Sequence, residues 1–134
     1  MKKLIIHSDG GSRNNPGQAA IGVVVANEQG EVITTISRSL GIATNNQAEY
    51  AAVIAGLEKA KELKAQEVEC FLDSELVVKQ LKGEYKVKNK DLAPFFLKAY
   101  NLSVKLKKVT FRHIRREENQ EADRLVNEAL DNLE

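Results

Sequence analysis

The chain has 134 residues, a formal net charge of +1 and an apolar fraction of 43%. This length fits one domain, so residues 1–134 are expected to fold as a single unit whose core needs no covalent staples. The composition excludes a disordered chain, and a single cysteine, Cys70, excludes an internal disulfide. The longest apolar run, Ala19–Ala26, is too short to cross a bilayer. We therefore expect a monomeric protein of the cytoplasm that spans no membrane.

Basic side chains are concentrated in the third quarter of the chain, although the total charge is nearly balanced. Local basic character with overall neutrality suits a protein that gathers acidic groups in one place and binds phosphates in another. The alternative is a solvated, lysine-rich surface with no ligand. The lysines of this region are Lys79, Lys82, Lys86, Lys88, Lys90, Lys98, Lys105, Lys107 and Lys108, and they are followed by Arg112, Arg115 and Arg116.

Three strands are expected in the first third of the chain, because short apolar runs alternate there with turn-forming residues. Gly10-Gly11 is expected to end the first strand. Asn14-Asn15-Pro16-Gly17 predicts a turn, and Asn27-Glu28-Gln29-Gly30 predicts a hairpin. The expected strands are residues 4–9, 20–26 and 32–40.

Helices dominate the remainder. Thr44-Asn45-Asn46 is a helix start, and apolar residues at helical spacing continue that helix to about Leu63. The other expected elements are a strand at 68–72, helices at 74–81, 92–106 and 117–130, and a strand at 109–114. The order β-β-β-α-β-α-α-β-α predicts an α/β fold. Tight turns make its antiparallel part, and helical crossovers add strands parallel to the first.

Four carboxylates occupy positions from which such a fold could bring them together. Asp9 and Asp73 each follow a predicted strand, and the carboxyl ends of parallel neighbours emerge at one sheet edge, where open α/β sheets place their sites. Glu49 lies in the first turn of the long helix, and Asp123 lies in the last helix.

Each carboxylate also has a purely structural interpretation. Asp9 before two glycines could form a turn. Glu49 could complete a capping box with Asn46, and Asp73 could cap the following helix. Asp123 could belong to a solvated helix face.

Four motifs surround these acids in chain order. They are Asp9-Gly10-Gly11-Ser12-Arg13-Asn14-Asn15-Pro16-Gly17, Thr44-Asn45-Asn46-Gln47-Ala48-Glu49, Asp73-Ser74 after an apolar strand, and His113 with Asn119 and Asp123. Their order and spacing resemble the type 1 ribonuclease H family, in a compact form without the long basic protrusion, and the resemblance covers essentially the whole chain. It implies a ribonuclease H-like fold whose mixed five-stranded sheet, three antiparallel strands plus two parallel, is flanked by helices.

The resemblance also implies an activity. The family hydrolyses the RNA strand of RNA–DNA hybrids by a two-metal-ion mechanism that leaves 5′-phosphate and 3′-hydroxyl ends. By this resemblance Asp9, Glu49, Asp73 and Asp123 would hold two Mg²⁺ ions, with Mn²⁺ as a substitute. Hard oxygen ligands suit Mg²⁺, and two such ions can activate water on one side of a phosphodiester and stabilise the leaving oxyanion on the other.

His113 matches the family's mobile histidine, which assists proton transfer or product release. Its structural alternative is a packed or surface histidine. His7 has no such match, and we interpret it as structural.

Selectivity for a hybrid requires contacts to the RNA 2′-hydroxyl. The resemblance assigns substrate contacts to Gly10, Gly11, Asn15, Thr44, Asn46 and Asn89. Glu75 departs from the family, in which some members have a glutamine that can donate a hydrogen bond. The chain has no tryptophan, and Gly83–Asn89 is short, so hybrid affinity is expected to depend on nearby lysines and to be sensitive to salt.

Two other functions remain open at this stage. The same fold and metals could act on double-stranded RNA or branched junctions. Alternatively, the chain could be a non-catalytic nucleic-acid-binding module, although binding alone does not require four converging acids.

Overall fold

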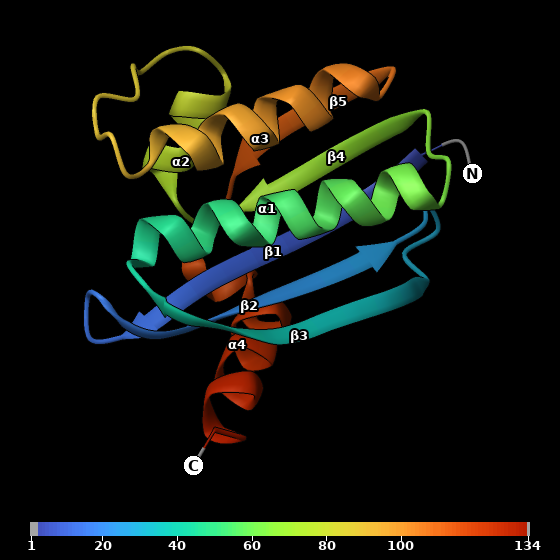
Figure 1. The fold of residues 1–134 in the computed structure, drawn as a ribbon. Coiled ribbons are helices and arrows are strands. Elements are labelled where there is room, and N and C mark those ends of the chain that lie inside the picture. Colours follow the sequence, from blue (N-terminus) through green and yellow to red (C-terminus); the bar gives the residue numbers. More distant parts are fainter. Residues whose placement is uncertain (1–2, 134) are drawn as a thin grey trace.

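The computed structural model describes residues 3–133. A five-stranded sheet in the order β3-β2-β1-β4-β5 forms its centre, with helices on both faces (Figure 1). The strands are β1 (Lys3–Arg13), β2 (Gly17–Ala26), β3 (Val32–Ala43), β4 (Glu67–Leu72) and β5 (Lys108–His113). The helices are α1 (Asn45–Glu62), α2 (Glu75–Leu81), α3 (Ala93–Lys105) and α4 (Gln120–Asp131), with a 3₁₀ turn, η1, at Arg116–Glu118. The predicted element order and the mixed sheet are confirmed.

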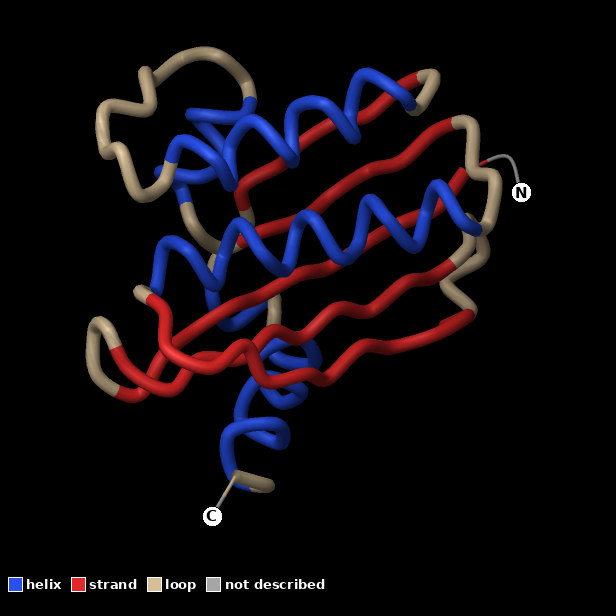
Figure 2. The backbone as a smooth tube through the Cα atoms, in the orientation of Figure 1, coloured by secondary structure: helices blue, strands red, loops and turns tan. Residues whose placement is uncertain are grey.

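The strand directions follow from the connections. β1, β2 and β3 are antiparallel neighbours, joined by short turns (Figure 2). In the turn between β2 and β3, the side-chain oxygen of Asn27 accepts hydrogen bonds from the backbone N–H groups of Gln29 and Glu31. β4 and β5 are reached through helices and run parallel to β1. The carboxyl ends of β1, β4 and β5 therefore point in the same direction.

The prediction that Gly10-Gly11 ends the first strand is wrong. β1 continues to Arg13, with Gly10 paired to Ile21 and Gly11 paired to Ala20 on β2. The reason for glycine at position 10 is the neighbouring helix: a Cβ there would lie 2.1 Å from the backbone oxygen of Ala48. Gly10 thus allows close contact between strand and helix. From the sequence alone, a glycine with this role cannot be distinguished from one that ends a strand.

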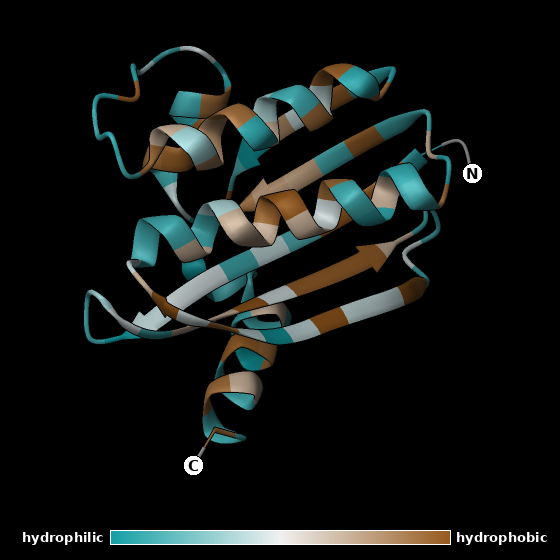
Figure 3. Cartoon of the chain, viewed as in Figure 1, coloured by the Kyte–Doolittle hydropathy of each residue, from teal (hydrophilic) through white to brown (hydrophobic). Residues whose placement is uncertain are grey.

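Helix α1 packs across the sheet and forms the centre of the core. Thr44 caps it: the Thr44 hydroxyl accepts a hydrogen bond from the N–H of Gln47, and the Gln47 side chain accepts one from the N–H of Thr44. The buried Tyr50 hydroxyl donates to Gln80 at 2.6 Å and so connects α1 to α2. Figure 3 shows the apolar residues of β2 in brown within the sheet beneath this helix.

Helix α4 covers the opposite face of the sheet, against β2 and β3. Its apolar side, which includes Val126, Ala129 and Leu130, packs on Ala20. The predicted helix at 117–130 is not continuous, because η1 ends at Glu118 and the next residue, Asn119, has φ and ψ of −120° and 32°, which are not helical. Asn119 is therefore the N-cap of α4, which forms a separate element. Among residues 3–133, we find no helix with the combination of length and apolarity needed to cross a membrane.

Candidate active site

Asp9 and Asp73 meet because of the parallel pairing of β1 with β4. The last paired residues of that ladder are Ser8 and Leu72, so the next residue on each chain segment is one of the two acids. This is the convergence at a sheet edge that the strand order predicts. Asp9 lies within β1 and not in a turn, and Ser74, not Asp73, caps α2 by accepting from the N–H of Val77. The structural interpretations of both acids are therefore wrong.

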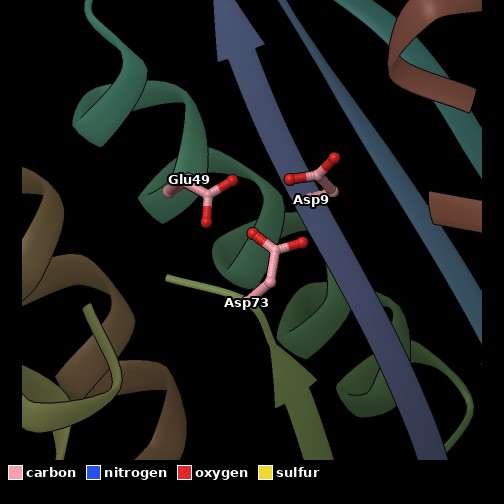
Figure 4. Close-up of side chains that lie close together, drawn as sticks. All are labelled: Asp9, Glu49 and Asp73. Carbon is pink, nitrogen blue, oxygen red and sulfur yellow. The ribbon is translucent and has the colours of Figure 1, made fainter. Parts of the chain in front are cut away.

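Glu49 reaches the same point from α1 (Figure 4). One carboxylate oxygen from each of Asp9, Glu49 and Asp73 lies within 4.8 Å of the others. The backbone N–H of Gly10 donates to Oε1 of Glu49 at 2.6 Å. The other oxygen, Oε2, is buried and has no hydrogen-bond partner among the described residues. Because Thr44 and Gln47 form the capping box, Glu49 is free of that structural role.

The acids of this group lie close together, and Asp9 and Glu49 are buried away from water. Burial, followed by the charges of Asp73 and Asp123, raises the pKa of Asp9 to about 7, while its hydrogen bond with Glu49 acts in the opposite direction. Burial also raises the pKa of Glu49 well above its ordinary value, and its hydrogen bond with Asp9 adds to this. Both effects penalise negative charge, so the site favours either retained protons or a bound cation.

Asp123 completes the acidic cavity from the other face of the sheet. It lies in the first turn of α4 and is about one-third exposed. With Asp9, Glu49 and Asp73 it lines a cavity of about 380 Å³, but it is not part of the 4.8 Å group. Its charge raises the pKa of Asp9, and Arg116 lies 3.7 Å from its carboxylate. The structure therefore places Asp123 at the site, outside the tight cluster.

Gly10 and Gly11 line the acidic cavity, and the other predicted substrate contacts line an adjoining one. That second cavity, of about 410 Å³, includes Asn15, Thr44, Asn46 and Asn89. Asn45, to which the sequence analysis assigned no role, lines both cavities. Its backbone N–H donates to Asn15, and its side-chain oxygen accepts from the N–H of Ser12. Asn45 lies between Thr44 and Asn46 in the second motif, and this position could have indicated that it belongs to the site.

His113 lines neither of these two cavities. It is exposed at the end of β5, in register with Leu72. It lines a cavity beside Arg112 and Lys82, not the cavity of the four acids. The structure thus places it one strand beyond Asp73, at the same edge of the sheet.

Asn119 also had no assigned role, although it was part of the fourth motif. Its side-chain nitrogen donates to the backbone oxygen of Ser8 at 2.9 Å and to Oδ2 of Asp73 at 3.0 Å. The residue is only 1% exposed. A buried amide thus contacts one of the acids directly.

Comparison with known proteins agrees with this geometry. The profile of the family described as "Reverse transcriptase-like" matches residues 7–129. The chain is 33% identical over 150 residues to a ribonuclease H of Clostridium botulinum, covering 98% of this chain and 97% of that protein. The chain belongs to the ribonuclease H family. The structure of LC11-RNase H1 in complex with an RNA/DNA hybrid is 43% identical, covers 97% of this chain and 98% of that one, and has a TM-score of 0.92.

Another relative shows that this ribonuclease H domain also occurs within longer proteins. A "bifunctional protein" of Mycobacterium tuberculosis is 42% identical over 130 residues, covering 96% of this chain. The chain spans 36% of the length of that relative. The domain organisation of that relative therefore does not transfer to this protein.

Proposed function

We propose that this ribonuclease H domain is an endonuclease that hydrolyses the RNA strand of RNA–DNA hybrids and leaves 5′-phosphate and 3′-hydroxyl ends. One observation carries the proposal: three carboxylates from separate elements converge within 4.8 Å, two of them buried, beside a cavity lined by polar amides. A fold that needed only stability would not gather buried acids without cationic partners. The hybrid-bound relative supports the choice of substrate.

The residues fit a pair of divalent cations. Glu49 Oε2 is buried without a hydrogen-bond partner among residues 3–133, as expected for an oxygen reserved for a metal ion. The donor set consists of carboxylate oxygens, which Mg²⁺ prefers, and Mn²⁺ should substitute. Asp9, Glu49 and Asp73 would form the common part of the site, and Asp123 would add a ligand from α4. When bound, such ions supply an activated water and stabilise the leaving oxygen.

The residues of the chain then have separable tasks. The N–H of Gly10 holds one carboxylate oxygen of Glu49 in place by a hydrogen bond. This bond also fixes the orientation of the other oxygen, Oε2. The raised pKa values of Asp9 and Glu49 favour bound protons, which must leave when cations bind. His113 is exposed at the end of β5, in register with Leu72, and at this sheet edge it would assist proton transfer or product release.

Hybrid recognition would use the second cavity. Asn89 accepts hydrogen bonds from the N–H groups of Asp91 and Leu92, which leaves its amide NH₂ to donate to a phosphate. Asn15, Thr44 and Asn46 line the same cavity. Such contacts read sugar and phosphate and not base sequence. Glu75 is exposed and lies 3.4 Å from Lys79. Because a carboxylate only accepts hydrogen bonds, we propose no donation from Glu75 to a base edge.

The test is cleavage of matched, end-labelled substrates: an RNA–DNA hybrid, duplex RNA and duplex DNA, each with Mg²⁺, Mn²⁺ or excess chelator. We expect the hybrid alone to be cut, with 5′-phosphate ends, and chelator to stop the reaction. In the same assay Asn89→Ala should raise KM several-fold with little change in kcat. Equal cutting of all three duplexes would remove hybrid selectivity. Binding of the hybrid without any cutting would indicate a non-catalytic module.

We further propose that the protein acts as a monomer in the cytoplasm. Cys70 is a free, buried thiol, and burial raises its pKa to about 12, which suits a structural cysteine in a reducing compartment. Light scattering coupled to size exclusion should give a mass near 14.9 kDa. A dimer mass at micromolar concentration would contradict this.

A further inference from the structure

Asn119 lies where the elements that carry three of the acids come together. Its side-chain amide donates to Oδ2 of Asp73, which follows β4, and to the backbone oxygen of Ser8, the residue before Asp9 on β1. Its own backbone oxygen accepts from the N–H of Asp123 in the first turn of α4 at 3.1 Å. One buried residue is therefore bonded to one acid directly and to the backbone at or beside two others.

The chemistry of the contact requires an amide. An asparagine NH₂ group has two hydrogens, and here one serves a carbonyl and the other a carboxylate. Aspartate has the same shape but, when ionised, would present an acceptor to two acceptors and place a further negative charge against Asp73. The Oδ1 atom of Asn119 is buried without a partner among residues 3–133, so the side chain is held through its nitrogen.

We propose that Asn119 is a positioning residue of the metal site, which holds Asp73 in the orientation that cation binding needs and fixes α4, and with it Asp123, to the sheet at that point. This inference rests on the proposed function for the role of the acids. By holding Oδ2 of Asp73, Asn119 restricts the rotation of that carboxylate. Groups that orient a ligand in this way commonly affect metal affinity by about 10–100-fold.

A double-mutant cycle in metal-free protein tests the contact without cleavage or nucleic acid. At pH 8, Asn119→Asp should lower the Tm by about 5–10 °C, because it leaves Ser8 O unpaired and opposes Asp73. In the Asp73→Asn background the same change should cost much less, since the amide introduced there can donate to the new carboxylate. Asn101→Asp, an equal charge change on the exposed surface of α3, should cost little in either background.

The second readout is the Mg²⁺ concentration that gives half of the metal-induced rise in Tm. Asn119→Ser, which removes the double donor without adding charge, should raise that concentration at least about tenfold and lower kcat more than it raises KM. This variant also covers the case in which Asn119→Asp does not fold.

An equal cost of Asn119→Asp in both backgrounds, or an unchanged Mg²⁺ midpoint in Asn119→Ser, would reduce Asn119 to a helix-start residue. A wild-type protein that cuts no hybrid would instead contradict the proposed function, and it would leave the metal-free cycle interpretable.

Discussion

Asp9→Asn should abolish hybrid cleavage and, in the same protein, stabilise the metal-free fold at alkaline pH. The loss of activity should be about a thousandfold or more, because the central carboxylate of the cluster is removed. The gain in stability has the opposite origin. Without a cation, Asp9 is a buried acid among other acids, and asparagine keeps its shape without its charge. A residue whose removal destroys function and improves stability is placed for function.

The pH dependence follows from the sign of the pKa change. The folded chain holds the Asp9 proton up to about pH 7, whereas the unfolded chain releases it near pH 4. The folded state therefore binds more protons in this interval, so the contribution of Asp9 to stability is greatest below pH 4 and is lost as pH rises through 7. A pKa displaced from 3.8 to about 7 corresponds to roughly 4 kcal/mol as an upper bound. We expect a gain of about 1–3 kcal/mol for Asp9→Asn at pH 8 and almost none at pH 4.

Denaturant unfolding in chelator at several pH values measures this directly. Asp131→Asn, an exposed aspartate that pairs with Arg13, is the matched control and should show no such pH-dependent gain. Mg²⁺ should stabilise the wild type and have a smaller effect on Asp9→Asn. A large loss of metal-free stability in Asp9→Asn would mean that the carboxylate is a structural element of β1.

The position of the site was predictable from the sequence in part, and the reason differs for each acid. Asp9 and Asp73 follow from general rules, because strands that are parallel neighbours bring their carboxyl ends together. Glu49 and Asp123 do not. Their places depend on how α1 and α4 lie against the sheet, which local patterns do not specify, and only the motif resemblance indicated them.

The errors in the sequence analysis have the same physical origin. Gly10 was interpreted as a strand end because glycine usually interrupts strands, whereas here it accommodates Ala48, which is distant in sequence. The break at Asn119 was missed because its hydrogen bonds reach Ser8, 111 residues away. Propensity rules describe residues that are neighbours in sequence, whereas these two positions are determined by contacts between residues that are far apart in sequence.

Gly10→Ala is expected to have the second large effect, in this case by destabilising the fold. The added Cβ would lie 2.1 Å from the backbone oxygen of Ala48 and 2.6 Å from the backbone nitrogen of Glu49. Backbone atoms cannot rotate away as a flexible side chain can, so α1 must shift from β1. We expect a loss of about 3 kcal/mol or more in the free energy of unfolding. Cleavage should fall at least about a hundredfold, since the shift lengthens the 2.6 Å bond that orients Glu49.

Gly11→Ala separates this contact from a general effect of alanine in the strand. A Cβ at Gly11 would meet its nearest atom, Cγ1 of Val126, at 3.8 Å, which is an ordinary contact. Its free energy of unfolding should change by less than about 1 kcal/mol. Because Gly11 lines the acidic cavity, only stability is compared between the two variants. If Gly10→Ala were as stable as Gly11→Ala and still cut the hybrid, then close packing of α1 on β1 would not be what brings Glu49 to Asp9 and Asp73.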